Sequence, residues 1–201
     1  MIKLISFFLS MAAAKEAKAL SDKPEKQIEF LSEFYSNAVN KVEYRAALND
    51  ALKRIKENKQ RYLKAEKICE IPWQMIAAVH YREAHCRFDR QLLNGQKVCK
   101  KTTLVPKGLG PWESWEHSCK DAFAHVKKPK NLQGWLDWAE KHNGLGYRNR
   151  GLFSPYMYAG TTFYQKGLYV ADGKFNEEKI DKRVGVIPIL KGLNFSDSIK
   201  N

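Results

Sequence analysis

The residue that first suggests chemistry is Glu83, near the end of an apolar segment that reads IPWQMIAAVHYREAHCRF from Ile71 to Phe88. A glutamate in this position can act as a surface charge that pairs with a neighbouring arginine. It can also act as a proton donor, because glycoside cleavage needs one carboxylic acid that stays protonated, and apolar surroundings favour the neutral form. Five tryptophans and nine tyrosines suit sugar binding, although core packing is the commoner role of any single one.

Metal-dependent and nucleophilic chemistries fit the sequence poorly. His80 and His85 are five residues apart, which offsets them by roughly 140° on a helix, and His117 and Cys119 have no matching partner pair. The sequence contains no G-x-S-x-G elbow, P-loop or dinucleotide fingerprint. We therefore expect neither a metal nor another cofactor.

The composition is that of a folded and strongly basic chain. Its 201 residues, of which 44% are hydrophobic, are enough for the core of one domain. The formal net charge of +13 favours acidic polymers as partners, which means nucleic acid or the anionic cell envelope. The lysines are spread along the chain and form no recognisable nucleic-acid-binding module, so we expect the anionic cell envelope, and not nucleic acid, as the partner. We also expect the protein to be a monomer.

Residues 1–19 have the pattern of an export signal. Lys3 precedes an apolar run, residues 4–14, and Ala17-Lys18-Ala19 offers a small-x-small cleavage site. The alternative is the start of an amphipathic helix, because two charged residues lie unusually close to the cleavage site. We expect a secreted or periplasmic protein without a membrane span, since no internal segment is long and apolar enough to form one.

An exported chain with an even number of cysteines favours disulfides. The four residues are Cys69, Cys86, Cys99 and Cys119, and their number allows three pairings. We favour Cys86–Cys99, which would close the loop after the Glu83 segment, together with Cys69–Cys119. The alternative is that they are free thiols packed as small hydrophobic side chains.

Apolar periodicity predicts a mainly α fold. Residues 20–70 read as two or three amphipathic helices, and Pro72 fits the first turn of the helix that carries Glu83. Further helices are expected over residues 112–126, 132–141 and 177–193, with a loop over residues 101–111. Asn94-Gly95 predicts a tight turn, with a short hairpin around it, and the Tyr-rich segment after residue 150 predicts loops with a short strand pair.

Several ordered motifs resemble a known family. The run IPWQMIAAVHYREAHCRFDRQLLNG, then HNGLGYR, SPYMYAGTTFY and KGLYVADGKF, is similar to lysozyme-like proteins of phage tails and bacterial envelopes, which are related to goose-type lysozymes and lytic transglycosylases. The resemblance covers roughly residues 70–190. It implies a lysozyme-like catalytic domain over residues 71–201, with the helices of residues 20–70 packed on it. This sequence departs from its relatives at residues 84–86, where AHC replaces small polar residues.

The resemblance also implies roles for individual residues. Glu83 matches the catalytic acid of the family. The implied substrate-binding residues are Tyr81, Asn143, Gly144, Tyr147, Ser154 and Tyr156. The chain is also similar to secreted lysozymes of predatory bacteria that attack peptidoglycan whose glucosamine has lost its acetyl groups.

The expected function is therefore cleavage of peptidoglycan glycan strands by a muramidase with Glu83 as general acid. One alternative is a lytic transglycosylase, which forms anhydro-muropeptides, and another is a wall-binding module without catalysis. Glu113, Asp137 and Asp172 are candidates for a second acid, although each is more typical of a surface charge. Tyr147 and Tyr156 are the alternative groups for orienting water or substrate.

Overall fold

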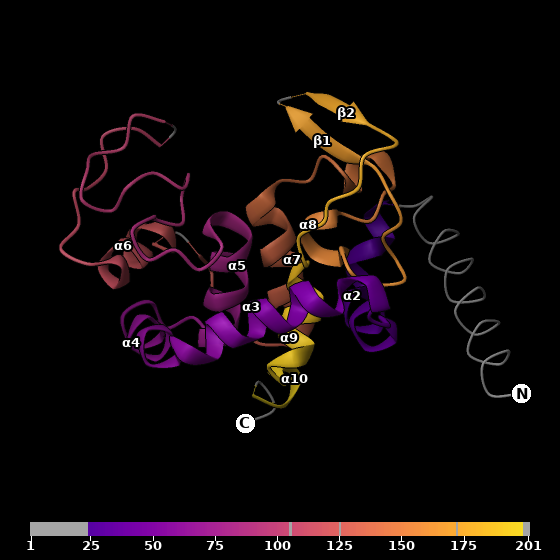
Figure 1. Ribbon diagram of the computed structural model, residues 1–201, viewed down its shortest axis with the longest axis horizontal. Helices are drawn as coiled ribbons and strands as arrows, with labels where there is room; N and C mark the ends of the chain where they lie inside the picture. The colour runs from indigo at the N-terminus through magenta and orange to yellow at the C-terminus, as the bar shows by residue number, and fades with distance from the viewer. Residues whose placement is uncertain (1–23, 105, 125, 172, 199–201) are drawn as a thin grey trace, which may run out of the picture.

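The computed structural model describes residues 24–104, 106–124, 126–171 and 173–198 and is mainly helical, with a small antiparallel sheet (Figure 1). The elements are α2 (Pro24–Asn37), η1 (Val42–Tyr44), α3 (Arg45–Glu57), α4 (Lys59–Cys69), α5 (Trp73–Ala84), α6 (Trp115–Ala122), α7 (Leu132–Asn143), η2 (Arg148–Arg150), α8 (Pro155–Tyr158), β1 (Leu168–Ala171), β2 (Lys174–Asn176), α9 (Val186–Gly192) and α10 (Phe195–Ser198). This architecture confirms the predicted fold class. The predicted export signal lies outside the described residues.

Helices α2, α3 and α4 correspond to the amphipathic segments that periodicity predicts before residue 70. Each buries one stripe of side chains, which includes Leu31 and Phe34 on α2, Ala51 and Ile55 on α3, and Tyr62 and Ala65 on α4. Helix α2 packs on α7, and α4 packs on both α5 and α6. The three helices therefore contribute to the same hydrophobic core as the rest of the chain.

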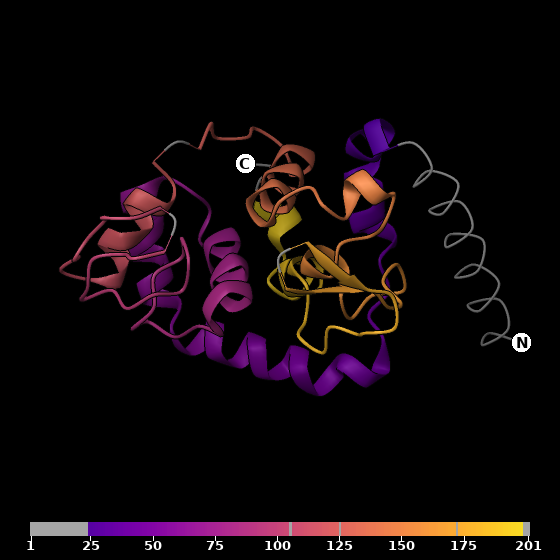
Figure 2. The same ribbon diagram turned by 90° about the horizontal axis from the view of Figure 1, so that it is seen from above.

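Helix α5 runs through the middle of the molecule (Figure 2). Pro72 immediately precedes its first residue, close to the predicted position, and ten of its twelve residues are buried. The helix ends at His85, which adopts a left-handed conformation with φ of 52° and donates its backbone N–H to the carbonyl of Tyr81. Glu83 lies in this last turn, so a nearly fully buried helix holds its backbone.

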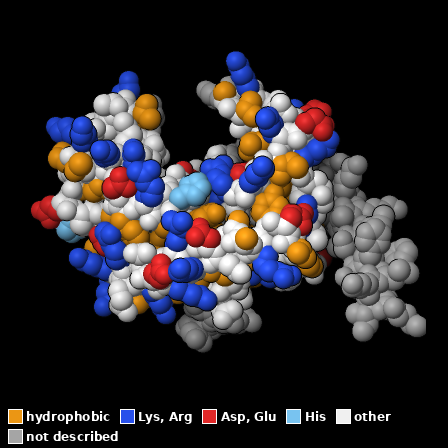
Figure 3. Space-filling model, in the orientation of Figure 1, with side chains coloured by type: hydrophobic (Ala, Val, Ile, Leu, Met, Phe, Trp, Pro, Cys, Tyr) orange, Lys and Arg blue, Asp and Glu red, His pale blue; other side chains and the backbone are white. Residues whose placement is uncertain are grey.

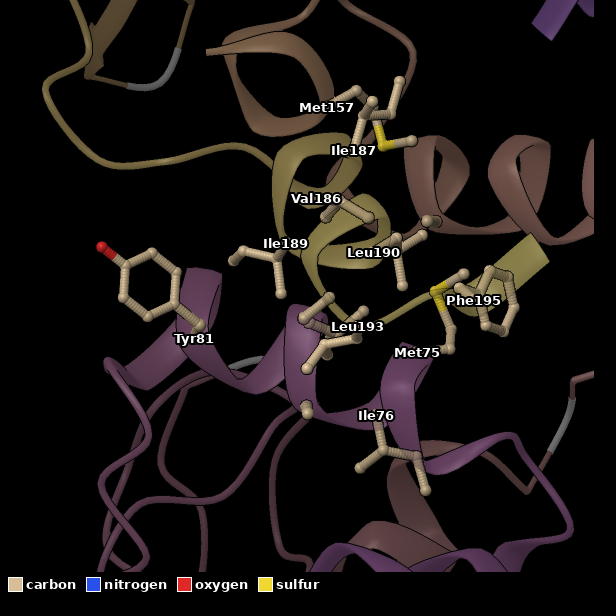
Figure 4. Close-up of a cluster of buried hydrophobic side chains, with 14 of the residues drawn as sticks. Met75, Ile76, Tyr81, Met157, Val186, Ile187, Ile189, Leu190, Leu193 and Phe195 are labelled. Carbon is tan, nitrogen blue, oxygen red and sulfur yellow. The ribbon is translucent and has the colours of Figure 1, made fainter. Parts of the chain in front are cut away.

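Helix α9 forms the apolar partner of α5 and replaces the longer helix predicted for residues 177–193. Helix α9 packs on α5, and its side chains Val186, Ile189 and Leu190 belong to the same buried cluster as Met75 of α5 (Figure 4). The chain enters α9 through Gly185, where an added Cβ would lie 2.5 Å from the carbonyl oxygen of Met157. The close approach of α9 to α8 therefore requires glycine at this position.

Helix α6 is shorter than the predicted helix over residues 112–126. Ser114 caps it by accepting a hydrogen bond from the backbone N–H of His117, which fixes its first turn at Trp115. Trp112 lies outside the helix and donates its indole N–H to Asp121 at 2.7 Å. The N-terminal end of the predicted helix is thus replaced by a cap and a side-chain contact, and at the other end the helix stops at Ala122.

The Asn94-Gly95 turn is present, with Gly95 at φ of 70°, but the predicted hairpin around it is reduced to one antiparallel bridge between Arg90 and Lys97. The side chain of Gln91 accepts hydrogen bonds from the backbone of Leu93 and Asn94, which occupies the groups that a longer ladder would need. The strand pair predicted after residue 150 is confirmed as β1 and β2, which pair antiparallel.

Neither predicted disulfide is formed, because all four cysteines are free thiols. The Cys69 and Cys119 thiols are hydrogen-bonded to each other, so the predicted partners are neighbours. Cys86 is buried and hydrogen-bonded to Tyr62, whereas Cys99 is exposed. The two cysteines of the predicted Cys86–Cys99 pair therefore lie in different environments, one in the core and one on the surface. Within the described part of the chain, no helix combines the length and apolarity needed to cross a membrane.

Candidate active site

The carboxyl group of Glu83 lies where α5, α7 and α8 meet. The hydroxyl of Tyr156 donates a hydrogen bond to Oε1 of Glu83 at 3.0 Å, and Nε2 of His142 lies 3.9 Å from the same oxygen. The side chain of Glu83 is 27% exposed. The carboxyl group is therefore held by a donor on one side and partly exposed, so that a bound ligand could come within hydrogen-bond reach of it.

Tyr156 is well suited to hold this carboxyl group because it is buried on α8. Burial raises the pKa of its phenol well above the ordinary value, and the nearby Glu83 carboxylate adds to the effect, so the hydroxyl stays protonated and donates. Ser154 caps α8 by accepting a hydrogen bond from the backbone N–H of Tyr156. Pro155 occupies the first position of the helix, where its missing N–H costs nothing.

His142 is the second neighbour of the Glu83 carboxyl group. Burial lowers the pKa of its imidazole, although the Glu83 carboxylate opposes this effect, so the ring is neutral near pH 7. The ring centroid lies 5.6 Å from that of Trp138, one helical turn earlier, and 6.3 Å from that of Phe123. An aromatic cluster thus fixes a polar but uncharged group beside the acid.

The turn after α7 brings Asn143, Gly144 and Tyr147 to the same region. Gly144 ends the helix with φ of 95°, a conformation that favours glycine. The hydroxyl of Tyr147 accepts a hydrogen bond from the backbone N–H of Tyr169 at 2.9 Å, which ties the turn to β1. Buried Arg148 anchors the turn to α7 through its ion pairs with Asp137 and Glu140.

Asn143, Gly144, Tyr147 and Tyr156 line a cleft of about 590 Å³, which the Glu83 carboxyl group adjoins through its contact with the Tyr156 hydroxyl. Its described lining consists of Arg82, Asn143, Gly144, Gly146, Tyr147, Pro155, Tyr156, Leu168, Tyr169, Val170, Ala171, Gly173, Asp181 and Arg183. Figure 3 shows that the upper face of the molecule is hollowed between two raised parts, and Figure 1 places the β1–β2 hairpin on one side of this hollow. A volume of this size suits a ligand of a few sugar rings, since small-molecule sites span roughly 300–1,000 Å³.

An arginine–aspartate–arginine cluster forms part of the cleft wall. The Arg82 guanidinium donates to Asp181 Oδ2 at 2.8 Å, and Arg183 donates from Nε to Oδ1 at 3.0 Å and from Nη2 to Oδ2 at 2.9 Å. Burial of Asp181 acts to raise its pKa, but the hydrogen bonds and charges of the two arginines outweigh this effect and lower the pKa to about 2. Asp181 is therefore ionised throughout the neutral range.

Four of the predicted site residues besides Glu83 are brought together by the structure, namely Asn143, Gly144, Tyr147 and Tyr156. The other two lie elsewhere. Tyr81 is buried on α5 beside α9, because two residues along a helix place its side chain roughly 200° from that of Glu83. Ser154 is buried and serves as the cap of α8, so its hydroxyl supports Tyr156 without lining the cleft.

The candidates for a second acid are not placed beside Glu83 by any described contact. Glu113 is 89% exposed and pairs with His117 on the surface. Asp137 pairs with Arg148 and Lys141 and lines a different pocket, next to α6. Asp172 lies outside the described residues. Among the described residues that line the cleft, the carboxylate is that of Asp181, which the sequence analysis did not single out.

Sequence reasoning missed His142, Arg82, Asp181 and Arg183 as parts of the site. The spacing of Trp138 and His142, four residues apart, is a signal that the two rings share a helix face. The contact between Arg82 and Asp181 spans 99 positions, and no local spacing indicates it. Within the described residues, no group of three or more His, Cys, Asp and Glu side chains is arranged to hold a metal ion.

Comparison of the chain with protein-family models, with curated proteins and with solved structures gives no match. The resemblance to lysozyme-like proteins therefore stays an expectation that rests on the sequence motifs.

Proposed function

We propose that this protein is a secreted or periplasmic peptidoglycan glycan-strand hydrolase, a muramidase, in which Glu83 is the general acid. The observation that carries the proposal is the partly exposed Glu83 carboxyl group, which accepts a hydrogen bond from the Tyr156 hydroxyl and adjoins a cleft of about 590 Å³. The residues of the HNGLGYR and SPYMY motifs supply much of the cleft wall, so the motifs that carry the resemblance meet at one place.

In the proposed reaction, Glu83 donates its proton to the glycosidic oxygen between N-acetylmuramic acid and the next sugar. The bond between this oxygen and the anomeric carbon breaks, and the oxocarbenium-like transition state is attacked by an oxygen nucleophile. In hydrolysis the nucleophile is water, whose proton passes to a base or to solvent. Tyr156 keeps the Glu83 carboxyl group in one orientation through this sequence.

A second candidate reaction is the lytic transglycosylase route, and a specific observation favours it. The carboxylate among the described lining residues, Asp181, is bound by two arginines and has a pKa of about 2, which makes it a poor base. In the transglycosylase route the muramic 6-hydroxyl attacks the anomeric carbon, and its proton returns to the Glu83 carboxylate. This route needs no second carboxylate, and its product is an anhydro-muropeptide.

The expected preference for deacetylated peptidoglycan has less support from the cleft. A protonated glucosamine amine is best bound by an excess of acidic groups, but Asp181 and Glu83 are matched here by Arg82 and Arg183. The preference is therefore proposed on the sequence resemblance alone. The strong positive charge of the whole chain suits attraction to the anionic wall.

The test is digestion of purified peptidoglycan, native and chemically deacetylated, by the wild type and by Glu83→Gln, with products identified by mass spectrometry. The amide keeps the size of the side chain but has no acidic proton to donate. We expect muropeptides from the wild type and from the matched control Glu113→Gln, and a loss of at least 100-fold in rate for Glu83→Gln. A product lighter by one water identifies the transglycosylase route.

Two other results would contradict the proposal. Cleavage by Glu83→Gln at the wild-type rate excludes this residue as the acid. Binding of peptidoglycan by the wild type without release of any muropeptide would instead identify a wall-binding module.

A further inference from the structure

We infer that the Arg82–Asp181–Arg183 cluster binds a carboxylate carried by the muramic acid unit of the substrate. This inference rests on the proposed function and deepens it, because it names the chemical group that the cleft wall recognises. The cluster has two guanidinium groups and one carboxylate, and all three residues line the cleft next to Tyr156. The cluster itself therefore carries one positive charge beyond that of its own carboxylate, and the neighbouring acid, Glu83, is uncharged while it holds the proton that it donates in the proposed reaction.

The half-exposed member of the cluster is Arg183. Its side chain is 42% exposed, whereas those of Arg82 and Asp181 are each 3% exposed. The fork of Arg183 is already oriented by two hydrogen bonds to Asp181, so it loses little freedom when a ligand binds. A planar guanidinium held in this way is suited to a carboxylate, which it can meet with parallel N–H groups.

Arg82 supplies a second and independent observation. Its Nε is buried and has no hydrogen-bond partner among the described residues, although its other nitrogens donate to Asp181 and to the carbonyl of Val184. A buried donor without an acceptor is uncommon and costs free energy of folding. The guanidinium also lies over the ring of Tyr156, 5.1 Å from its centroid, so Arg82 is close to the residue that is hydrogen-bonded to Glu83.

The other buried arginine cluster in the described structure has the opposite balance. Arg148 is shared by two carboxylates, Asp137 and Glu140, so its positive charge is more than neutralised. That cluster has the composition of a structural anchor for the turn after α7. The excess of arginine at Asp181 is therefore a property of the cleft wall and not of buried ion pairs throughout this protein.

The chemistry of the glycan strand identifies the ligand group. N-acetylmuramic acid carries a lactyl group whose carboxylate is free in peptide-stripped strands, and which is joined to a stem peptide with its own carboxylates in intact peptidoglycan. N-acetylglucosamine carries no carboxylate, and a protonated glucosamine amine would be repelled by the net charge of the cluster. The geometry thus points to the muramic unit as the sugar bound beside Arg183.

The test measures kcat/KM on three substrates, which are intact peptidoglycan strands, peptide-stripped strands with free lactyl carboxylates, and neutral N-acetylglucosamine oligosaccharides. The proteins are the wild type, Arg183→Gln, Arg183→Lys and the control Arg54→Gln, which removes another half-exposed arginine that is hydrogen-bonded to an aspartate. Arg82 is left in place, because loss of a buried ion-pair partner threatens folding.

For the wild type we expect higher kcat/KM on strands with carboxylates than on the neutral oligosaccharides. The ratio should fall about tenfold in Arg183→Gln, the size expected for loss of one charge-assisted hydrogen bond. Arg183→Lys should retain part of the ratio, and Arg54→Gln should retain all of it. A preference confined to peptide-stripped strands assigns the site to the lactyl carboxylate, and one confined to intact strands assigns it to the stem peptide.

Equal ratios in the wild type and in Arg183→Gln would overturn the inference and leave the proposed function standing. A wild type that cleaves the neutral oligosaccharides as well as the carboxylate-bearing strands would do the same. Absence of cleavage of either kind of peptidoglycan strand by the wild type would refute the proposed function itself, so the two failures are distinguishable.

Discussion

The substitution Asp181→Asn removes the carboxylate that pairs with the buried guanidinium of Arg82. The N–O distance of this pair is 2.8 Å, and both side chains are 3% exposed. Asparagine keeps the size of the side chain and one acceptor oxygen, but it leaves Arg82 as a buried charge without a counterion. We therefore expect a large loss of stability from a substitution that changes very little volume.

Two routes give the magnitude of this loss. Removal of one partner from a buried ion pair typically costs about 3–5 kcal/mol. The lowered pKa of Asp181, about 2 against an ordinary 3.8, corresponds to roughly 2 kcal/mol of unfolding free energy, a smaller figure because it already includes the cost of burying the carboxylate. We expect Asp181→Asn to lose between roughly 2 and 5 kcal/mol at pH 7.

The assay is urea unfolding at pH 7, followed by tryptophan fluorescence and circular dichroism. The control is Asp50→Asn, which removes an aspartate from the exposed pair with Arg54 on α3 and should cost at most about 0.5 kcal/mol. Because the folded-state pKa of Asp181 is lowered, its contribution is present above pH 3.8 and disappears as the pH falls toward 2. The difference in the free energy of unfolding between the wild type and Asp181→Asn should therefore become smaller over the same pH range.

A variant Asp181→Asn that is no less stable than Asp50→Asn would refute this reasoning. It would mean that the Arg82 guanidinium finds other acceptors at no cost, and that the cluster does not hold the cleft wall.

Two further predictions concern Tyr156 and His80. Tyr156→Phe removes the hydroxyl that holds the Glu83 carboxyl group, so kcat/KM on purified peptidoglycan should fall about tenfold or more with an unchanged circular dichroism spectrum; a wild-type rate would show that the hydrogen bond is dispensable. Burial lowers the pKa of His80 from 6.5 to about 3, so its contribution to the free energy of unfolding is fully present above pH 6.5 and declines by about 1.4 kcal/mol per pH unit as the pH falls from 6.5 toward 3. Urea unfolding at pH 6.5 and pH 5 should show a steeper loss for the wild type than for His80→Phe, and equal slopes would contradict the prediction.

Local rules in the sequence predicted most of the helices. Pro72 lies directly before α5, and the apolar stripes define α3 and α4. These signals work because helix ends and helix faces depend on residues within one or two turns. The same local view also indicates that Glu83 ends an apolar helix.

Side-chain direction and long-range contacts were beyond this local view. Tyr81 is near Glu83 in sequence but is buried in the core cluster, while Asp181 is distant in sequence and lies against Arg82. The first result follows from the 100° turn between helix residues, which a list of motif residues ignores. The second depends on how α9 and its preceding loop return to α5, which is a property of the whole fold.

The burial of α5 also determines which part of the site can move. Its backbone amides lie in the core, so their hydrogen exchange should require global unfolding and should be among the slowest in the protein. The β1–β2 hairpin on the cleft wall is a two-stranded ribbon whose strand residues are all partly or fully exposed. Its amides should therefore exchange through local opening. Adjustment to a ligand in the cleft is therefore expected from the hairpin, while Glu83 stays fixed on its helix.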